Sequence, residues 1–81
     1  MVVAPEDVKR YIEDNLNCEF VEVSGDGHHF EAVIVSAAFD GKSPVKRHQL
    51  VYQALGERMR EEIHALSMQT LTPQDWAARQ A

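Results

Sequence analysis

Cysteine, glycine and long apolar runs are all scarce in this chain of 81 residues, and each scarcity excludes something. There is one cysteine, Cys18, so the chain cannot form an internal disulfide or hold a metal cluster through its own thiolates alone. The four glycines form no phosphate-binding loop. The longest mostly apolar run, Ala32–Phe39, is too short to cross a bilayer.

Catalytic machinery is also lacking. No Ser/His/Asp or Cys/His arrangement is suggested by the sequence, and a domain of this size has too small a core for a closed active site. The sequence therefore predicts a protein that is not an enzyme.

Size and composition indicate one globular domain over residues 1–81. The chain is 44% apolar and 26% charged, with a formal net charge of −5, which is ordinary for a globular protein and argues against non-specific binding to nucleic acid or anionic membranes. The N-terminus lacks the charged start and apolar stretch of a signal peptide, so we expect a cytoplasmic location and no membrane association.

Apolar periodicity and capping residues predict seven elements in the order α-β-β-α-α-β-α. The first helix begins at Pro5 and ends near Asn17, and the last begins at Pro73 with Thr72 as its N-cap. Between them we expect three strands and two further helices: strands 18–23, 28–39 and 64–71, and helices 44–55 and 57–63.

These elements predict an α+β domain. The first two strands are joined by a short turn and form a hairpin, whereas a two-helix crossover separates the second strand from the third, so those two can be parallel. The result is a three-stranded mixed sheet with helices on one face. In helix 44–55 we expect Val45, His48, Tyr52 and Leu55 on the inward face, which makes His48 a packed residue.

The hairpin turn carries two adjacent histidines that the turn itself does not require. In "GDGHHF", Gly25, Asp26 and Gly27 reverse the chain, and His28 and His29 follow directly. The two histidines can be interpreted either as solvated side chains or as metal ligands. The same alternatives apply to His64, which stands where the third strand begins.

Several stretches together resemble the BolA family, especially its IbaG-like bacterial branch: "VSGDGHHF", "FDGKSPVKRHQLVYQAL" and "IHALSMQTLTPQDW". The resemblance covers about residues 5 to 80. It implies a fold similar to a class II KH domain. It also implies a heterodimer with a monothiol glutaredoxin that carries a CGFS motif, in which a [2Fe–2S] cluster bridges the two proteins.

In that pairing the glutaredoxin thiolate and a glutathione hold one side of the cluster. The resemblance places the BolA-side ligands at His64 and in the hairpin loop, where His29 matches better than His28. Imidazole binds the iron of such clusters as thiolate does, so a chain with one cysteine can complete a shared site. No cofactor is expected in the isolated chain, which should be a monomer or weak homodimer.

One dense positive region, made of Lys42, Lys46 and Arg47 and followed by His48, spans a loop and the start of a helix. Such a cluster is usually a solvated face, but in a KH-like fold nucleic acid approaches this junction. The G-x-x-G clamp of KH domains is incomplete here, because "DGKS" has only its first glycine.

The function predicted from the sequence is that of a non-catalytic partner of a glutaredoxin, acting in iron–sulfur cluster trafficking or in iron and stress sensing. The alternative is a KH-like transcriptional regulator that binds DNA through Lys42, Lys46 and Arg47. A docking module in which the histidines are incidental is a third reading.

Overall fold

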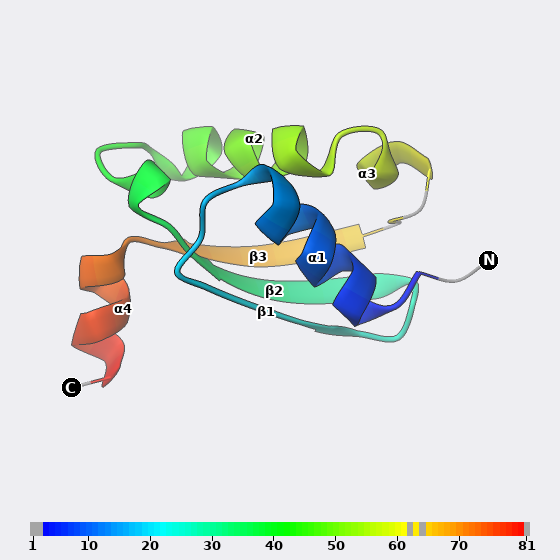
Figure 1. Ribbon diagram of the computed structural model, residues 1–81, viewed down its shortest axis with the longest axis horizontal. Coiled ribbons are helices and arrows are strands. Elements are labelled where there is room, and N and C mark those ends of the chain that lie inside the picture. Colours follow the sequence, from blue (N-terminus) through cyan, green and yellow to red (C-terminus); the bar gives the residue numbers. More distant parts are fainter. Residues whose placement is uncertain (1–2, 62, 64, 81) are drawn as a thin grey trace.

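The structure is a computed structural model that describes residues 3–61, 63 and 65–80. The observed order agrees with the predicted one and adds a single 3-10 turn (Figure 1). The elements are α1 (Pro5–Asn15), β1 (Phe20–Gly25), β2 (His29–Val35), η1 (Ala37–Phe39), α2 (Pro44–Leu55), α3 (Arg58–Glu61), β3 (Ala65–Leu71) and α4 (Pro73–Gln80).

The three strands form one mixed sheet in the order β1-β2-β3. β1 and β2 are antiparallel, with Val21 opposite Ile34 and Gly25 opposite Phe30. β2 and β3 are parallel, with His29 opposite Ala65 and Val35 opposite Leu71. The crossover through α2 and α3 therefore makes the parallel pair that the sequence predicted, and the α+β fold is confirmed.

One face of the sheet forms the core, and α1 and α2 lie over this face (Figure 1). Alternation along the strands divides the side chains, since Phe30, Ala32 and Ile34 are buried while Glu31 between them is exposed. Residues from both helices complete the core, among them Val8, Ile12, Val51 and Leu55, which are all fully buried.

The helix ends follow the capping residues read from the sequence. The hydroxyl of Ser43 accepts a hydrogen bond from the Lys46 backbone N–H at 3.3 Å, and α2 ends at Leu55 with Gly56 as its C-cap. At α4 the Thr72 hydroxyl accepts from Asp75 N–H at 3.1 Å, and the Asp75 carboxylate accepts from Thr72 N–H at 3.4 Å. Thr72 is thus confirmed as the N-cap of the last helix, and with Asp75 it forms a capping box.

The second strand is shorter than predicted. It ends at Val35 rather than Phe39, because the Ser36 hydroxyl donates to the Asn17 carbonyl at 2.6 Å and accepts from Ala38 N–H at 3.1 Å. These bonds turn residues 37–39 into the 3-10 helix η1 and leave Phe39 fully buried. A hydroxyl in an apolar run gives the backbone an alternative to the sheet.

The predicted inward face of α2 was wrong for two of its residues. Val45 is 66% exposed and Tyr52 is 40% exposed, whereas the buried positions are Val51, Ala54 and Leu55. His48 lies at the boundary and is half-buried. The helix therefore carries two apolar stripes, and the stripe with Val51, Ala54 and Leu55 packs into the core beneath it.

α4 stands apart from the other helices. None of its residues is buried, and Trp76 anchors it by stacking on Phe20 with the ring centroids 4.8 Å apart. Phe20 neighbours the buried Val21 in β1, so its side chain lies on the opposite face of the sheet from α1 and α2. No described helix is both long and apolar enough to span a membrane.

Candidate functional site

Asp26 organises the turn that presents the two histidines. One oxygen of its carboxylate, Oδ1, accepts the backbone N–H groups of both His28 and His29, each at 2.9 Å. These two hydrogen bonds lower the pKa of the Asp26 carboxyl below its ordinary value of 3.8, and the bond from His29 has the larger effect. The turn therefore has a fixed backbone while the histidine side chains remain exposed.

Glycine is required at two positions of this turn. A Cβ on Gly25 would collide with the carbonyl oxygen of His29 and lie 2.8 Å from Cδ1 of Phe30, so the two strands can approach only because this residue has no side chain. Gly27 has φ of +98°, a conformation that residues with a Cβ rarely adopt. The chain passes directly from this turn into β2.

The strands that the predicted ligand segments precede or begin, β2 and β3, start at the same end of the sheet. His29 is the first residue of β2, and its register partner Ala65 is the first residue of β3. Because the pair is parallel, both strands begin at the same end of the sheet (Figure 1). His64, the main predicted ligand, lies outside the described residues; Ala65 follows it directly in the sequence.

The donors in the described part of the chain do not form a metal site by themselves. Among residues 3–61, 63 and 65–80 no group of three or more histidine, cysteine or acidic side chains is close enough to hold a metal ion. Imidazoles at the exposed hairpin are suited to a site that a partner completes. The predicted ligands His28, His29 and His64 stay predictions.

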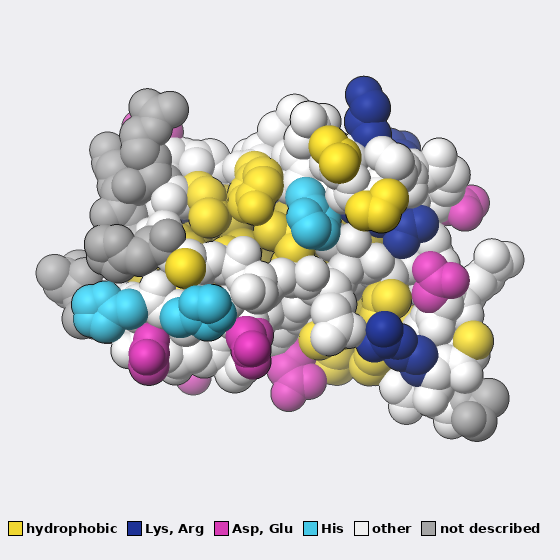
Figure 2. Space-filling model, turned by 180° about the vertical axis from the view of Figure 1, so that it is seen from behind, with side chains coloured by type: hydrophobic (Ala, Val, Ile, Leu, Met, Phe, Trp, Pro, Cys, Tyr) yellow, Lys and Arg dark blue, Asp and Glu magenta, His cyan; other side chains and the backbone are white. Residues whose placement is uncertain are grey.

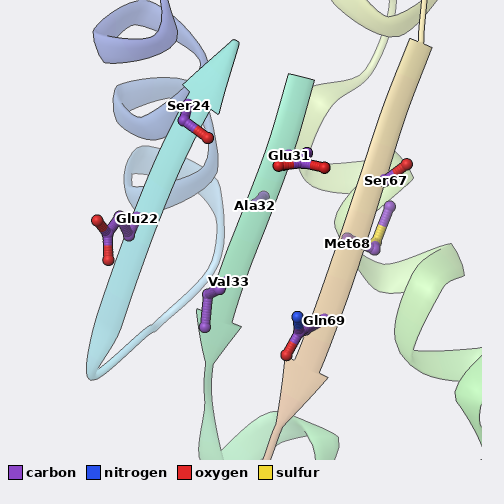
Figure 3. A pocket seen from close by; sticks show the side chains of 8 residues that line it. All are labelled: Glu22, Ser24, Glu31, Ala32, Val33, Ser67, Met68 and Gln69. Carbon is purple, nitrogen blue, oxygen red and sulfur yellow. The ribbon is translucent and has the colours of Figure 1, made fainter. Parts of the chain in front are cut away.

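The bare face of the sheet beside His29 is polar and open (Figure 3). Its shallow depression is lined by Glu22, Ser24, Glu31, Ala32, Val33, Ser67, Met68 and Gln69. The carboxylate of Glu31, two residues after His29, extends from β2 toward β3. That Ser67 of β3 lies opposite Glu31 could be found only from the strand register, since the sequence alone does not say which strands lie side by side.

Cys18 is not suited to bind a cluster. The half-buried thiol has its pKa raised to about 11, first by desolvation and then by the nearby carboxylate of Glu13. A thiol with so high a pKa stays protonated at neutral pH. Cys18 packs against the core instead, as a small apolar side chain does.

The basic cluster divides into two kinds of side chain. Lys42 and Lys46 are exposed, whereas Arg47 is tied into the fold. Its guanidinium donates to the carbonyl of Lys42 at 2.9 Å and to that of Thr70 at 3.0 Å, and lies 3.8 Å from the Asp75 carboxylate. Sequence reasoning missed this structural role, because Thr70 and Asp75 are far from Arg47 along the chain.

The chain matches the family model described as BolA-like protein over residues 10–75. It is 40% identical over 72 residues to the acid stress protein IbaG of Escherichia coli K12, which covers 88% of this chain and 86% of that protein. It is 33% identical over 82 residues to the DNA-binding transcriptional regulator BolA of Haemophilus influenzae, covering 89% of this chain and 80% of that one.

A solved structure shows the same fold. The BolA protein homologue from Coxiella burnetii superposes on this chain with a TM-score of 0.86 at 46% sequence identity. The superposition covers 93% of this chain and 97% of that one. The family match over residues 10–75 and the superposition thus each cover most of this chain.

Proposed function

This chain belongs to the BolA-like protein family, and from that premise we propose that it is a non-catalytic partner of a monothiol glutaredoxin. In this proposal the two proteins form a heterodimer that shares a bridging [2Fe–2S] cluster. His64 and His29 provide the ligands from this chain, with His28 as the alternative to His29. The partner's thiolate and a glutathione provide the ligands on the other side.

The observation that carries the proposal is the pairing of His29 with Ala65. Paired residues in adjacent strands lie about 5 Å apart between their Cα atoms, and Ala65 is the direct neighbour of His64 in the sequence. A bridging cluster needs the two ligands from this chain to lie close together. The strand register supports this proximity, because β2 and β3 begin side by side.

The chemistry of the available donors supports a shared cluster over a resident one. The exposed hairpin offers imidazoles, while the raised pKa of Cys18 keeps the described thiol protonated. Sulfur ligands must then come from outside the chain. Histidine ligation raises the reduction potential of a [2Fe–2S] cluster relative to thiolate ligation and makes the site sensitive to acid, because protonated imidazole does not bind metal.

The test is anaerobic co-purification with a monothiol glutaredoxin and glutathione, followed by visible absorption and circular dichroism spectra. We expect His64→Ala to abolish the spectrum of the mixed cluster. His29→Ala and His28→Ala are compared in parallel, and the larger loss identifies the second ligand. Cys18→Ser is the matched control and should leave the spectrum unchanged.

A spectrum that His64→Ala leaves unchanged would contradict the proposed ligand set. Loss of the spectrum in Cys18→Ser would contradict it as well, because a thiolate from this chain would then be required. Far-ultraviolet circular dichroism of each variant confirms that it is folded before the comparison is made.

A second candidate function is binding of DNA, which the Haemophilus influenzae relative's name attributes to that protein. Within the basic cluster of Lys42, Lys46 and Arg47, the exposed lysines suit phosphate contacts, whereas Arg47 already donates to two carbonyls. We expect Lys42→Ala with Lys46→Ala to weaken DNA binding and reduce its salt dependence, measured by fluorescence anisotropy. His64→Ala is the control that separates this activity from cluster sharing.

A further inference from the structure

Asp26 binds the backbone of His29 through two hydrogen bonds. The His29 N–H donates to Oδ1 of the Asp26 carboxylate at 2.9 Å, and the Asp26 N–H donates to the His29 carbonyl at 3.3 Å. Gly25 and Phe30 are the last paired residues of the hairpin, so Asp26 and His29 are the next facing pair, with a side-chain oxygen as one of the acceptors. Asp26 therefore extends the pairing of β1 with β2 by one step, up to the histidine.

The strand determines the direction in which His29 points. It is the first residue of β2 and neighbours Phe30, which is fully buried in the core. Because successive side chains of a strand point to opposite faces, the imidazole of His29 lies on the bare face of the sheet. His28 precedes the strand and follows Gly27, whose φ is +98°, so the turn determines its position.

Both histidines are exposed, but Asp26 holds their backbones to different extents. At the end of the molecule that carries the hairpin, Figure 2 shows histidine side chains at the surface with acidic side chains directly beside them. Asp26 bonds to the N–H of His28 at 2.9 Å, and to both the N–H and the carbonyl of His29. A side chain on a fixed backbone loses less conformational freedom when it binds a ligand. His29 is therefore the better prepared of the two donors.

We propose that Asp26 is a positioning residue for the shared cluster, a role that rests on the proposed function. It holds the backbone of His29 at the start of β2 and thereby makes His29, rather than His28, the ligand from the hairpin. Asp26 acts through the backbone of the histidine, to which its carboxylate is directed. Without this acceptor, the glycine-containing turn can adopt more than one conformation and both imidazoles change position with it.

The first test uses the free chain without a cluster. Amide hydrogen exchange, followed by nuclear magnetic resonance, compares the native chain with Asp26→Ala. We expect the His29 amide to exchange faster in the variant, because its N–H has lost an acceptor, while the amide of Ile34 in the middle strand keeps its rate. An unchanged rate at His29 overturns the proposal. Equal changes at the two amides overturn it too, because the whole domain would then be destabilised.

The second test measures the affinity for the cluster. Each variant is titrated into a monothiol glutaredoxin loaded with a [2Fe–2S] cluster and glutathione, and the visible circular dichroism of the mixed complex gives an apparent dissociation constant. We expect Asp26→Ala to raise this constant roughly tenfold, since groups that orient a metal ligand typically change metal affinity by about 10- to 100-fold. Asp26→Asn keeps the acceptor oxygen and should recover most of the affinity.

Removal of each histidine separates the choice of ligand from a general structural effect. With Asp26 present, His29→Ala should weaken the mixed complex much more than His28→Ala does. In the Asp26→Ala background the two histidines become nearly equivalent, so the same two substitutions should have similar effects. If His29→Ala remains the more damaging change by the same factor in both backgrounds, Asp26 does not select the ligand and the proposal is wrong.

The matched control is Asp14→Ala, which removes the same charge from an exposed position of α1. It should leave the dissociation constant unchanged, and a rise equal to that of Asp26→Ala would assign the effect to net charge. If the native chain forms no mixed cluster, the proposed function fails and the role of Asp26 fails with it. If the native chain forms the cluster and Asp26→Ala binds it equally well, only the role of Asp26 is refuted.

Discussion

At the scale of single residues, the hairpin shows how one carboxylate can hold a loop in place. Asp26 accepts two backbone N–H groups, and its pKa is lowered as a result. The histidines that follow are therefore presented on a defined backbone without being buried. A ligand that must meet a partner protein needs this combination of a fixed position and an open side chain.

The lowered pKa of Asp26 predicts a pH dependence of the turn. The folded state binds this proton less tightly than the unfolded chain, so the carboxylate stabilises the turn above the ordinary pKa of 3.8. That stabilisation is lost as the pH falls through the lowered value. Nuclear magnetic resonance should show the Asp26 carboxyl titrating below 3.8, with the His28 and His29 amide signals shifting at the same midpoint.

The matched variant for this prediction is Asp26→Asn, which keeps an acceptor oxygen but has no charge to titrate. In it the two amide signals should stay constant over the same acid range. A persistent midpoint in Asp26→Asn would show that another group controls the turn.

At the scale of elements, α4 depends on its cap more than on burial. It buries none of its residues, and its contacts with the rest of the molecule include the Phe20–Trp76 stack and a hydrogen bond from Arg79 to the Gln69 side chain at 2.7 Å. A short helix of this kind is marginal by itself. The reciprocal bonds between Thr72 and Asp75 fix where it begins.

We expect Thr72→Ala to destabilise the protein by about 1 kcal/mol, because the N–H of Asp75 loses its capping acceptor. Thr72→Ser keeps the hydroxyl and should cost much less. Urea unfolding followed by circular dichroism gives the free energy of unfolding of each. Equal losses in the two variants would show that packing of the threonine methyl, and not the cap, is responsible.

Capping was predictable from the sequence because it is local. The side chains of Ser43, Thr72 and Asp75 bind backbone groups three residues away, so their effect can be predicted from spacing alone. The inward face of α2 was not predictable in this way. Val45 and Tyr52 form one apolar stripe and Val51 and Leu55 another, and only the positions of α1 and the sheet decide which stripe is buried.

At the scale of the whole molecule, Arg47 joins three elements. It lies on α2, donates to the carbonyl of Thr70 on β3, and approaches Asp75 at the start of α4. The ion pair with Asp75 contributes little to the stability of the fold, because its atoms are 3.8 Å apart and the Asp75 side chain is half exposed to water. The partly buried bond to Thr70 is the stronger of the two, since hydrogen bonds from charged donors contribute about 1.5–3 kcal/mol.

Arg47→Met should therefore lower the free energy of unfolding by about 2 kcal/mol, measured by urea denaturation. Lys46→Met is the matched control: its side chain is exposed, and substitutions at such positions usually change stability by less than about 0.5 kcal/mol. If both variants lose the same amount, the helix rather than the tie to β3 is responsible.

The overall topology could be predicted from the sequence, whereas the register between the strands could not. Seven elements and a crossover leave few arrangements, and the parallel pairing of β2 with β3 followed from them. Which residue of β2 faces which residue of β3 depends on contacts between residues 36 positions apart, and a slip of one residue would turn every side chain to the other face. The pairing of His29 with Ala65 came from the structure.

The parallel crossover also affects how the protein is made. β2 contains the most apolar stretch of the sheet, and its second neighbour, β3, lies 30 residues further toward the C-terminus. A growing chain therefore leaves the ribosome with one side of β2 unpaired until Ala65–Leu71 have been synthesised. Over that interval α1, β1 and α2 can cover one face of the nascent strand, while its free edge can bind a chaperone that recognises extended apolar segments.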